Sequence, residues 1–317
     1  MPVTVVRAHD APGPTLVVRL DRLPPGALAL RHELLHLRRT LATTRYAALN
    51  KIALYGPPSP RTPDAPARLS YRFVQALPDG SFDFRAGCGH SLLACVVADG
   101  RPGPVTVRTV TTGDTVLCEP QHQDQHQDQH QHQDQHQDPS GSASGVPPGV
   151  AYTLSFLRPP TAPGTLPTGR PVDVLHGVPV SLVRYGNPYV FVDARRLPGT
   201  DLRARLLALR AEAARRLGHP PGSALPKIAA FTETADGLAV RALTVDGWHP
   251  RLALTGAAAL AAAGALDGTV VPAVQGAVRT PDGTVTVSAA PDRIRVHHKR
   301  AEVLETLELP WRIHATA

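Results

Sequence analysis

The sequence predicts an α+β fold in which two pseudo-repeated domains each wrap a mostly antiparallel β-sheet around one central helix, with the active-site cleft between them. Two strand-like segments, 50–55 and 226–231, share a lysine followed by Ile-Ala. Each is followed by extended segments and by a helix of apolar and small residues, 92–98 or 257–266, that ends at an Asp-Gly pair. The same order and spacing in both halves indicates a duplication.

The other elements also occur in matching places along the chain. Outer helices are expected near 25–41 and over 201–217, the second with Asp201 as its N-cap. After each Asp-Gly pair, Thr and Val alternate over 105–116 and 285–289, as they do in half-buried strands. Each half is therefore expected to contain strands, an outer helix, more strands and an inner helix.

A low-complexity tract separates the two halves. Residues 121–138 are only Gln, His and Asp, and a Ser- and Gly-rich run follows them. Because such a composition cannot bury a core, we expect a disordered linker over 119–148. It would join an N-terminal domain, 1–118, to a C-terminal domain, 149–317, and the last residues of the C-terminal domain could return to the N-terminal domain. The histidines of the tract could gather a metal ion weakly, but a repeat-expanded linker is the favoured interpretation, so no metal ligand is assigned.

Composition excludes several classes of function. The net charge is +7, but aromatic residues make up only 4% of the chain, so a nucleic-acid surface of basic and aromatic side chains is not expected. The longest apolar run, 252–266, is shorter than the roughly 20 residues that span a membrane. Three cysteines without scaffold spacing and no recognisable leader favour the reducing cytoplasm. The positive charge favours a small anionic substrate, and a homodimer is left open.

Five segments together resemble the PrpF-type isomerases of the diaminopimelate epimerase-like fold. They occur in the family's order and cover nearly the whole chain outside the linker: Asn50-Lys51-Ile52-Ala53, Gly87-Cys88-Gly89-His90, the Gly-Asn-Pro strand 186–194, the segment 241–250 and Thr255-Gly256-Ala257-Ala258-Ala259. Members of this group act on small polycarboxylates such as methylaconitate or oxalomesaconate. The resemblance therefore implies a cofactor-independent isomerase that shifts a C=C bond in a small carboxylated metabolite.

The sequence departs from the family pattern in three places. His90 replaces an asparagine, the family's N-terminal Arg-Gly-Gly-Thr-Ser-Lys run is degraded over 7–15, and a His-Pro-Ser-Gly turn appears as Thr280-Pro281-Asp282-Gly283. These changes suggest a different acid as the substrate. A role in secondary metabolism, such as the biosynthesis of alkylproline units of antibiotics, is one refinement.

Moving a double bond needs one group to remove a proton and another to return one elsewhere, without a redox cofactor. The candidates are Lys51, which can be a base if burial lowers its pKa, and Cys88, at a helix start that stabilises a thiolate. The sequence does not say which of them removes the proton. Helix N-termini and nearby polar groups are expected to bind substrate: Asn50, Gly89, His90, Ser91, Asn187, His249, Thr255 and Gly256.

Less specific interpretations remain for several of these residues. His90 could be structural as readily as catalytic, and a buried turn histidine is favoured over a ligand for His249. An amino-acid racemase is the first alternative function, but it needs a second thiol or base, and Thr255 stands at the position matched to Cys88. A non-catalytic paralogue that binds a small acid or a metal is the second alternative.

Overall fold

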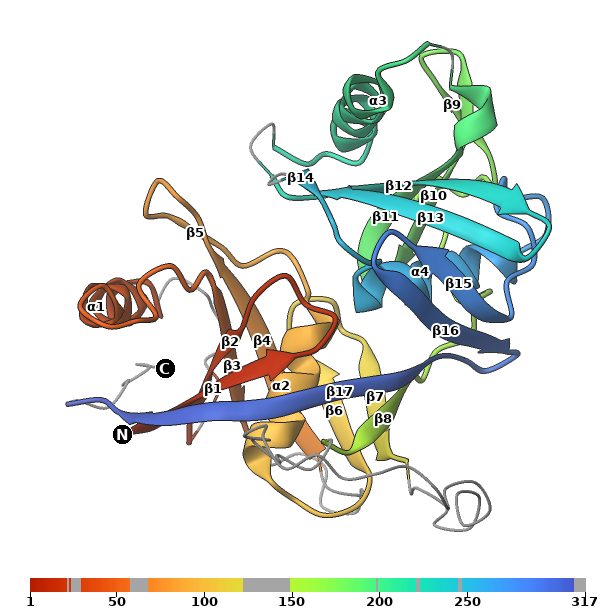
Figure 1. The fold of residues 1–317 in the computed structure, drawn as a ribbon. Helices are drawn as coiled ribbons and strands as arrows, with labels where there is room; N and C mark the ends of the chain where they lie inside the picture. The colour runs from red at the N-terminus through yellow and green to blue at the C-terminus, as the bar shows by residue number, and fades with distance from the viewer. Residues whose placement is uncertain are drawn as a thin grey trace, which may run out of the picture.

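The computed structural model describes residues 1–21, 23, 30–57, 68–121, 149–197, 199–220, 223–244 and 247–310. Within these residues the protein is mostly β, with four α-helices and one continuous 17-stranded sheet (Figure 1). None of these helices is both long and apolar enough to cross a bilayer. The Gln/His/Asp tract and its Ser/Gly continuation lie almost entirely outside the described residues, which resume at Gly149.

Eight strands of the sheet form a closed, barrel-like ring. Their neighbours in the ring follow the order β1, β2, β3, β4, β6, β7, β8 and β17, and β17 pairs again with β1. The short β5 (Phe82–Asp83) extends the end of β4. The strands of the ring are β1 (Pro2–Ala8), β2 (Thr15–Arg19), β3 (Lys51–Gly56), β4 (Arg68–Ala76), β6 (Val105–Thr109), β7 (Thr115–Pro120), β8 (Ala151–Phe156) and β17 (Arg293–Glu308).

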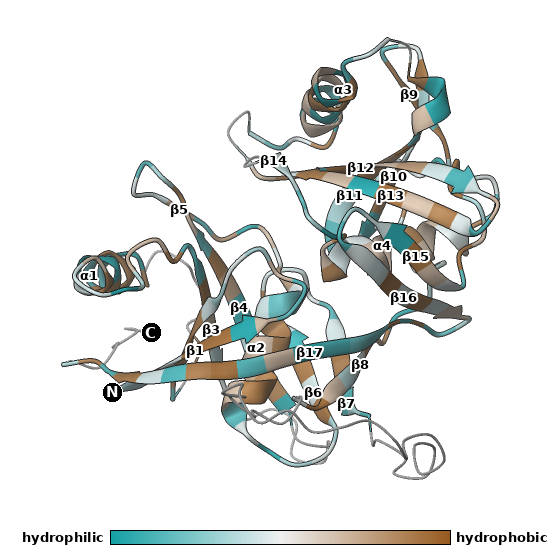
Figure 2. Cartoon of the chain, viewed as in Figure 1, coloured by the Kyte–Doolittle hydropathy of each residue, from teal (hydrophilic) through white to brown (hydrophobic). Residues whose placement is uncertain are grey.

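Helix α2 (Gly89–Asp99) packs against β1, β2, β3, β4 and β17 of this ring. Residues 89 to 96 of this helix are all buried, and burial on all sides requires a segment without charged side chains. Figure 2 shows the apolar character of the helix. Burying a side chain such as Leu92, Leu93 or Val96 contributes about 1.5–3 kcal/mol relative to exposure. The helix ends at Gly100, whose φ of 68° suits glycine.

The second part of the sheet curves around helix α4 (Leu254–Gly264), which packs against β10, β11, β16 and β17. Ten consecutive residues of α4, 254–263, are buried, and most of them are alanine. Small side chains allow the strands to approach the helix closely. The strands here are β9 (Asp173–Leu175), β10 (Val178–Tyr185), β11 (Asn187–Asp193), β12 (Lys227–Thr234), β13 (Gly237–Thr244), β14 (Gly247–Trp248), β15 (Gly276–Thr280) and β16 (Gly283–Ala290).

Each α-helix joins two strands that are parallel neighbours, because parallel pairing requires a crossover connection. The outer helix α1 (Arg31–Leu41) joins β2 to β3, and α3 (Leu202–Arg216) joins β11 to β12. The inner helices α2 and α4 join β4 to β6 and β13 to β15. A short 3-10 turn, η2 (Ala194–Arg196), precedes α3.

One strand belongs to both parts of the molecule. The beginning of β17 lies between β16 and β8, and its end pairs with β1 from Ala301 to Glu308. The pairing with β8 is irregular between Val296 and Lys299, where His298 has a φ of 56°. This strand fixes the two inner helices in relation to each other (Figure 1).

The sequence located most helices correctly. Helices α2, α4 and α3 occur where helices were expected, although α2 and α4 each begin three residues earlier than the expected 92 and 257. The Asp201 carboxylate caps α3 by accepting a hydrogen bond from the Ala204 amide at 2.9 Å. The other outer helix starts at Arg31, six residues later than the expected 25, and residues 24–29 lie outside the described part of the chain. Strand β7 extends to Pro120, so the first residues expected in the linker continue the sheet.

Candidate active site

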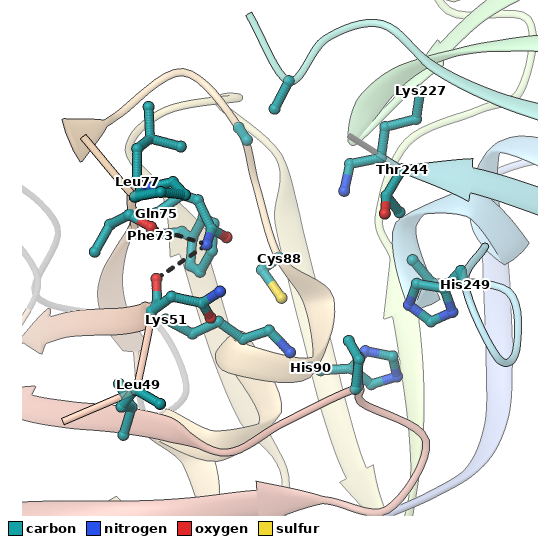
Figure 3. Close-up of a pocket in the computed structure, with 18 of the residues that line it drawn as sticks. Leu49, Lys51, Phe73, Gln75, Leu77, Cys88, His90, Lys227, Thr244 and His249 are labelled. Carbon is teal, nitrogen blue, oxygen red and sulfur yellow. Dashed lines mark hydrogen bonds between the residues drawn. The ribbon is translucent and has the colours of Figure 1, made fainter. Parts of the chain in front are cut away.

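A cavity of about 460 Å³ lies where the ends of the two inner helices meet. Its lining includes residues from β3, β4, the start of α2, β12 and the loop before α4. Figure 3 shows that Lys51, Cys88, His90, Lys227 and His249 project into it. The cavity therefore collects amines, a thiol and imidazoles from segments far apart in the sequence.

Lys51 is the first residue of β3 and enters the cavity from the ring of strands (Figure 3). Its Nζ donates a hydrogen bond to the backbone oxygen of Gly13 at 3.2 Å, in the loop between β1 and β2. Burial lowers the pKa of the Lys51 amine below its ordinary value of 10.5, and the nearby Cys88 thiolate partly offsets the shift. A neutral amine, which can accept a proton, is thus more accessible than on an exposed lysine.

Cys88 is the N-cap of α2, with an extended backbone (φ −139°, ψ 108°). Its side chain makes no capping hydrogen bond, which leaves the sulfur directed into the cavity beside Lys51 (Figure 3). The Cys88 carbonyl accepts hydrogen bonds from the Tyr71 hydroxyl at 2.8 Å and from the Leu92 amide at 3.0 Å. The backbone around the sulfur is therefore held in place at the helix N-terminus, where the peptide N–H groups carry a partial positive charge.

Asn187 fixes the same turn from the other part of the molecule. Its Oδ1 accepts from the Gly87 amide at 2.7 Å, and its Nδ2 donates to the Gly87 carbonyl at 2.8 Å. Nδ2 also lies 3.3 Å from the Thr255 hydroxyl. Asn187 is 1% exposed and does not line the cavity, and both of its amide groups instead bond to the backbone of the turn before Cys88.

Gly89 and Gly256 allow the two inner helices to approach each other and their neighbours. A Cβ on Gly89 would lie 2.5 Å from a methyl group of Leu254, at the start of α4. A Cβ on Gly256 would lie 2.6 Å from the Tyr189 hydroxyl oxygen. Neither glycine lines the cavity, and close packing explains both residues without a ligand.

Two histidines, His90 and His249, lie across the cavity from Lys51 (Figure 3). His249 is 7% exposed, and its Nδ1 lies 2.5 Å from the Arg251 carbonyl oxygen and 3.2 Å from the Arg251 amide nitrogen. Burial lowers the pKa of His249 to about 4. His90, the second residue of α2, is 3% exposed, and burial holds its pKa well below 6.5. Both imidazoles are therefore neutral at pH 7.

The structure thus brings together part of the expected site. Asn50, Lys51, Cys88, His90 and His249 line one cavity. The remaining expected residues do not line it. Ser91 is fully buried, and its hydroxyl lies 2.9 Å from that of Thr15. Thr255 also lies outside the lining, where Ala253 at the start of α4 takes its place, so no thiol faces Cys88 from α4.

Lys227 is a cavity residue that the sequence analysis did not assign. It is the first residue of β12, as Lys51 is the first residue of β3, and Figure 3 shows it pointing into the cavity from the opposite side. The repeated Lys-Ile-Ala segments were the signal that could have identified it. With Lys51, it places amines on both sides of Cys88.

A buried ion network behind the cavity was also missed. Asp10 accepts a hydrogen bond from Lys299 Nζ at 2.6 Å and forms an ion pair with Arg251 Nη1 at 2.7 Å, and Lys299 is 3% exposed. The network joins the loop that contains Gly13 to β17 and to the segment before α4. It therefore holds the loop that accepts the hydrogen bond from Lys51.

Solved structures show the same fold over nearly the whole chain. A methylitaconate-delta-isomerase is 21% identical, with a TM-score of 0.62, and covers 98% of both chains. A hydroxyproline epimerase from Agrobacterium vitis with bound trans-4-hydroxy-L-proline is 18% identical, with a TM-score of 0.57, and the match covers 97% of this chain and 91% of the other. A predicted epimerase from Pseudomonas aeruginosa is 16% identical, with a TM-score of 0.51, over 98% and 99%. At these identities the similarity establishes the fold alone.

Family membership comes from the sequence itself. No curated protein matches the chain. The family model described as "PrpF protein" matches residues 103–308, which is well over half of the 317 residues. The chain belongs to the PrpF protein family.

Proposed function

We propose that this protein is an isomerase that moves a C=C bond in a small carboxylated metabolite, with Lys51 and Cys88 transferring the protons. The observation that supports this most directly is the entry of an amine and a thiol into one cavity (Figure 3). The pKa of the amine is lowered by burial, and the thiol stands at a helix N-terminus. No further group is needed to balance the reaction.

One of the two groups removes a proton from a carbon next to the double bond, and the electron pair moves through that bond to a carbonyl or carboxylate oxygen. The other group returns a proton to the far carbon, and the pair moves back to form the shifted double bond. Either the neutral Lys51 amine removes the proton and the Cys88 thiol supplies one, or the thiolate removes it and the ammonium supplies one. Both routes conserve protons and electrons.

The substrate is proposed to be an anion. Lys51 and Lys227 both face the cavity, and two neutral histidines offer hydrogen bonds without adding a positive charge. The departures from the family pattern at His90 and 280–283 favour an acid other than methylaconitate, and a secondary-metabolic acid such as a precursor of alkylproline units is the refinement that we carry forward. We also infer that the reaction takes place without a cofactor.

The architecture is proposed to be a duplication of one domain. The series of a parallel pair, an antiparallel pair and a parallel pair occurs from β2 to β6 and again from β11 to β15. An outer and an inner helix occupy the same places in both series. Lys51 and Lys227 begin the equivalent strands, so the cleft between the halves receives one lysine from each.

The opposed positions of Lys227 and Cys88 favour a second candidate function, an epimerase. Such an enzyme needs two groups on opposite faces of one carbon, and the similar fold of a hydroxyproline epimerase is compatible with this. An epimerase exchanges a proton at a stereocentre and moves no double bond. The two candidates are therefore separated by the position at which solvent hydrogen enters the substrate.

The test is an incubation in deuterated water followed by NMR. Methylitaconate and related unsaturated dicarboxylates are supplied to the wild type, and hydroxyproline is supplied in parallel. Isomerisation predicts a shifted double bond with deuterium at the far carbon, and the Lys51→Met and Cys88→Ala variants should each lower the rate by about 10²-fold or more. Inversion of hydroxyproline without bond migration, or unchanged rates in both variants, would contradict the proposal.

A further inference from the structure

The Nε2 atom of His90 is buried and has no hydrogen-bond partner within the described residues. The side chain lines the cavity at the start of α2, two residues after Cys88. Leaving a buried polar atom unpaired costs about 1–3 kcal/mol, and few such atoms persist in native structures. Because the His90 side chain lines the cavity, a ligand bound there is in position to complete the hydrogen bonding of this buried nitrogen.

The surroundings of His90 determine which ligand atom that is. Burial is the main cause of the lowered pKa of His90, and the positive charges of Lys299 on β17, Lys51 on β3 and Lys227 on β12 lower it further. His249, in the loop before α4, also faces the ring and is neutral at pH 7. A neutral imidazole in this field has one N–H to donate. The complementary partner is an oxygen that carries negative charge.

We propose that His90 donates a hydrogen bond from Nε2 to the substrate oxygen on which negative charge develops while Lys51 and Cys88 transfer protons. This inference rests on the proposed function, because it concerns the enolate oxygen of that reaction. His90 loses no proton in the step. Its N–H remains on the ring, and the electron pair that arrives on oxygen returns to carbon when the second proton is delivered.

A neutral imidazole suits this role better than a charged one. An imidazolium would be acidic enough to protonate the enolate oxygen and to trap it as the enol. A neutral N–H stabilises the charge through the hydrogen bond alone, and its position is fixed by α2 before substrate binds. The inference also restricts the substrate, since the carbon that loses its proton must be conjugated to a carbonyl or carboxylate whose oxygen reaches His90.

The test compares two small anions that differ in where their charge lies. The preformed nitronate of 3-nitropropionate resembles a carboxylate with an adjacent carbanion, whereas succinate resembles only the ground state. Binding of both is measured by calorimetry to the wild type and to His90→Phe and His90→Gln. The Phe variant removes the donor, and the Gln variant keeps an amide nitrogen at about the distance of Nε2.

The wild type should bind the nitronate more tightly than succinate. His90→Phe should weaken nitronate binding by about 10²-fold, while succinate binding changes by less than about 3-fold, and His90→Gln should restore most of the difference. Because His90 is not titrating near neutrality, the pH midpoints of nitronate binding should be the same in the wild type and in His90→Gln. Equal loss of both ligands in His90→Phe, no loss of nitronate binding, or no preference for the nitronate in the wild type would overturn the inference.

Folding and function are separated by two further measurements. His90→Phe removes an unpaired buried nitrogen, so its unfolding free energy should not fall below that of the wild type, and a loss of nitronate binding without unfolding assigns the effect to the site. Nitronate binding needs no turnover. If nitronate binding depends on His90 but no acid is isomerised, His90 is a donor to anions in the cavity and the proposed function fails. Full isomerase activity in His90→Phe instead supports the proposed function and overturns the role of His90.

Discussion

Asn187 provides the sharpest test of how the site is built. Its side chain makes a two-bond contact with the backbone of Gly87, at 2.7 and 2.8 Å, in an environment where it is 1% exposed. Asn187→Ala leaves the half-buried amide and carbonyl of Gly87 without these partners. A fully buried unpaired group costs about 1–3 kcal/mol, and because Gly87 is only half-buried, the two groups together should lower the free energy of unfolding by about 2–4 kcal/mol.

The same substitution should lower activity, because the turn that it releases contains Cys88. A displacement of about 1 Å between reacting groups can cost about 10²-fold in rate. Stability is measured by urea unfolding, and the position of the sulfur by the rate at which Cys88 reacts with an alkylating agent. Cys95 and Cys118 are fully buried and do not contribute to that rate in the folded protein.

Gln275→Ala is the matched control. Gln275 makes the same kind of two-bond contact, with the Ala289 backbone at 3.1 and 3.3 Å, but it is exposed, so water replaces the lost bonds. Its substitution should change stability by less than about 0.5 kcal/mol. If Asn187→Ala is no more destabilising than Gln275→Ala, or leaves Cys88 alkylation and turnover unchanged, the positioning role of Asn187 is refuted.

Three further predictions concern other parts of the site. Because burial lowers the pKa of Lys51, the pH profile of kcat/KM should have a limb with its midpoint below 10.5. The limb rises with pH if the Lys51 amine is the base and falls if the ammonium is the acid, and a midpoint at or above 10.5 contradicts the prediction. The pKa of His249 is about 4 in the folded protein and about 6.5 in the unfolded chain, so its contribution to the free energy of unfolding is full above pH 6.5 and falls by about 3 kcal/mol as the pH drops through 4. Urea unfolding of His249→Gln should lack this pH-dependent loss. Gly256→Ala places a Cβ 2.6 Å from the Tyr189 hydroxyl and should cost about 1–3 kcal/mol in thermal unfolding, whereas Gly13→Ala, with nothing within 4 Å, should be neutral.

The local elements were predictable because their signals are local. Both inner helices are apolar runs followed by an Asp-Gly pair, which ends α2 directly and lies shortly after the end of α4 at Gly264. Helix α3 has a capping aspartate at its start, so neighbouring residues suffice to find all three. The closed ring was not predictable in this way. It depends on β17 pairing with β1 across almost the full length of the chain, and no residue near Arg293 or Pro2 specifies that partner.

In the site, residue types could be predicted from the sequence, but the directions of the side chains could not. The chemistry of Lys51 and Cys88 and their place at the start of a strand and a helix indicated a shared cavity. For Asn187 the residue type was informative but the direction of the side chain was not, because its hydrogen-bond partner is a backbone group 100 residues earlier. Lys299 stands beside Arg300 in a basic stretch of the sequence, yet it is buried against Asp10, because burial is decided by the strands that pack around it.

The continuity of β17 has a consequence for attempts to divide this protein. A fragment that ends near Gln121 would lack two adjacent strands of the ring, β8 and β17. The side of α2 that packs against β17 would then be open to water. The complementary fragment would contain β8 and β17 without β7 and β1, the strands with which they pair. The two pieces are therefore obligate partners, and co-expressed fragments should be recovered together in the soluble fraction while either one alone aggregates.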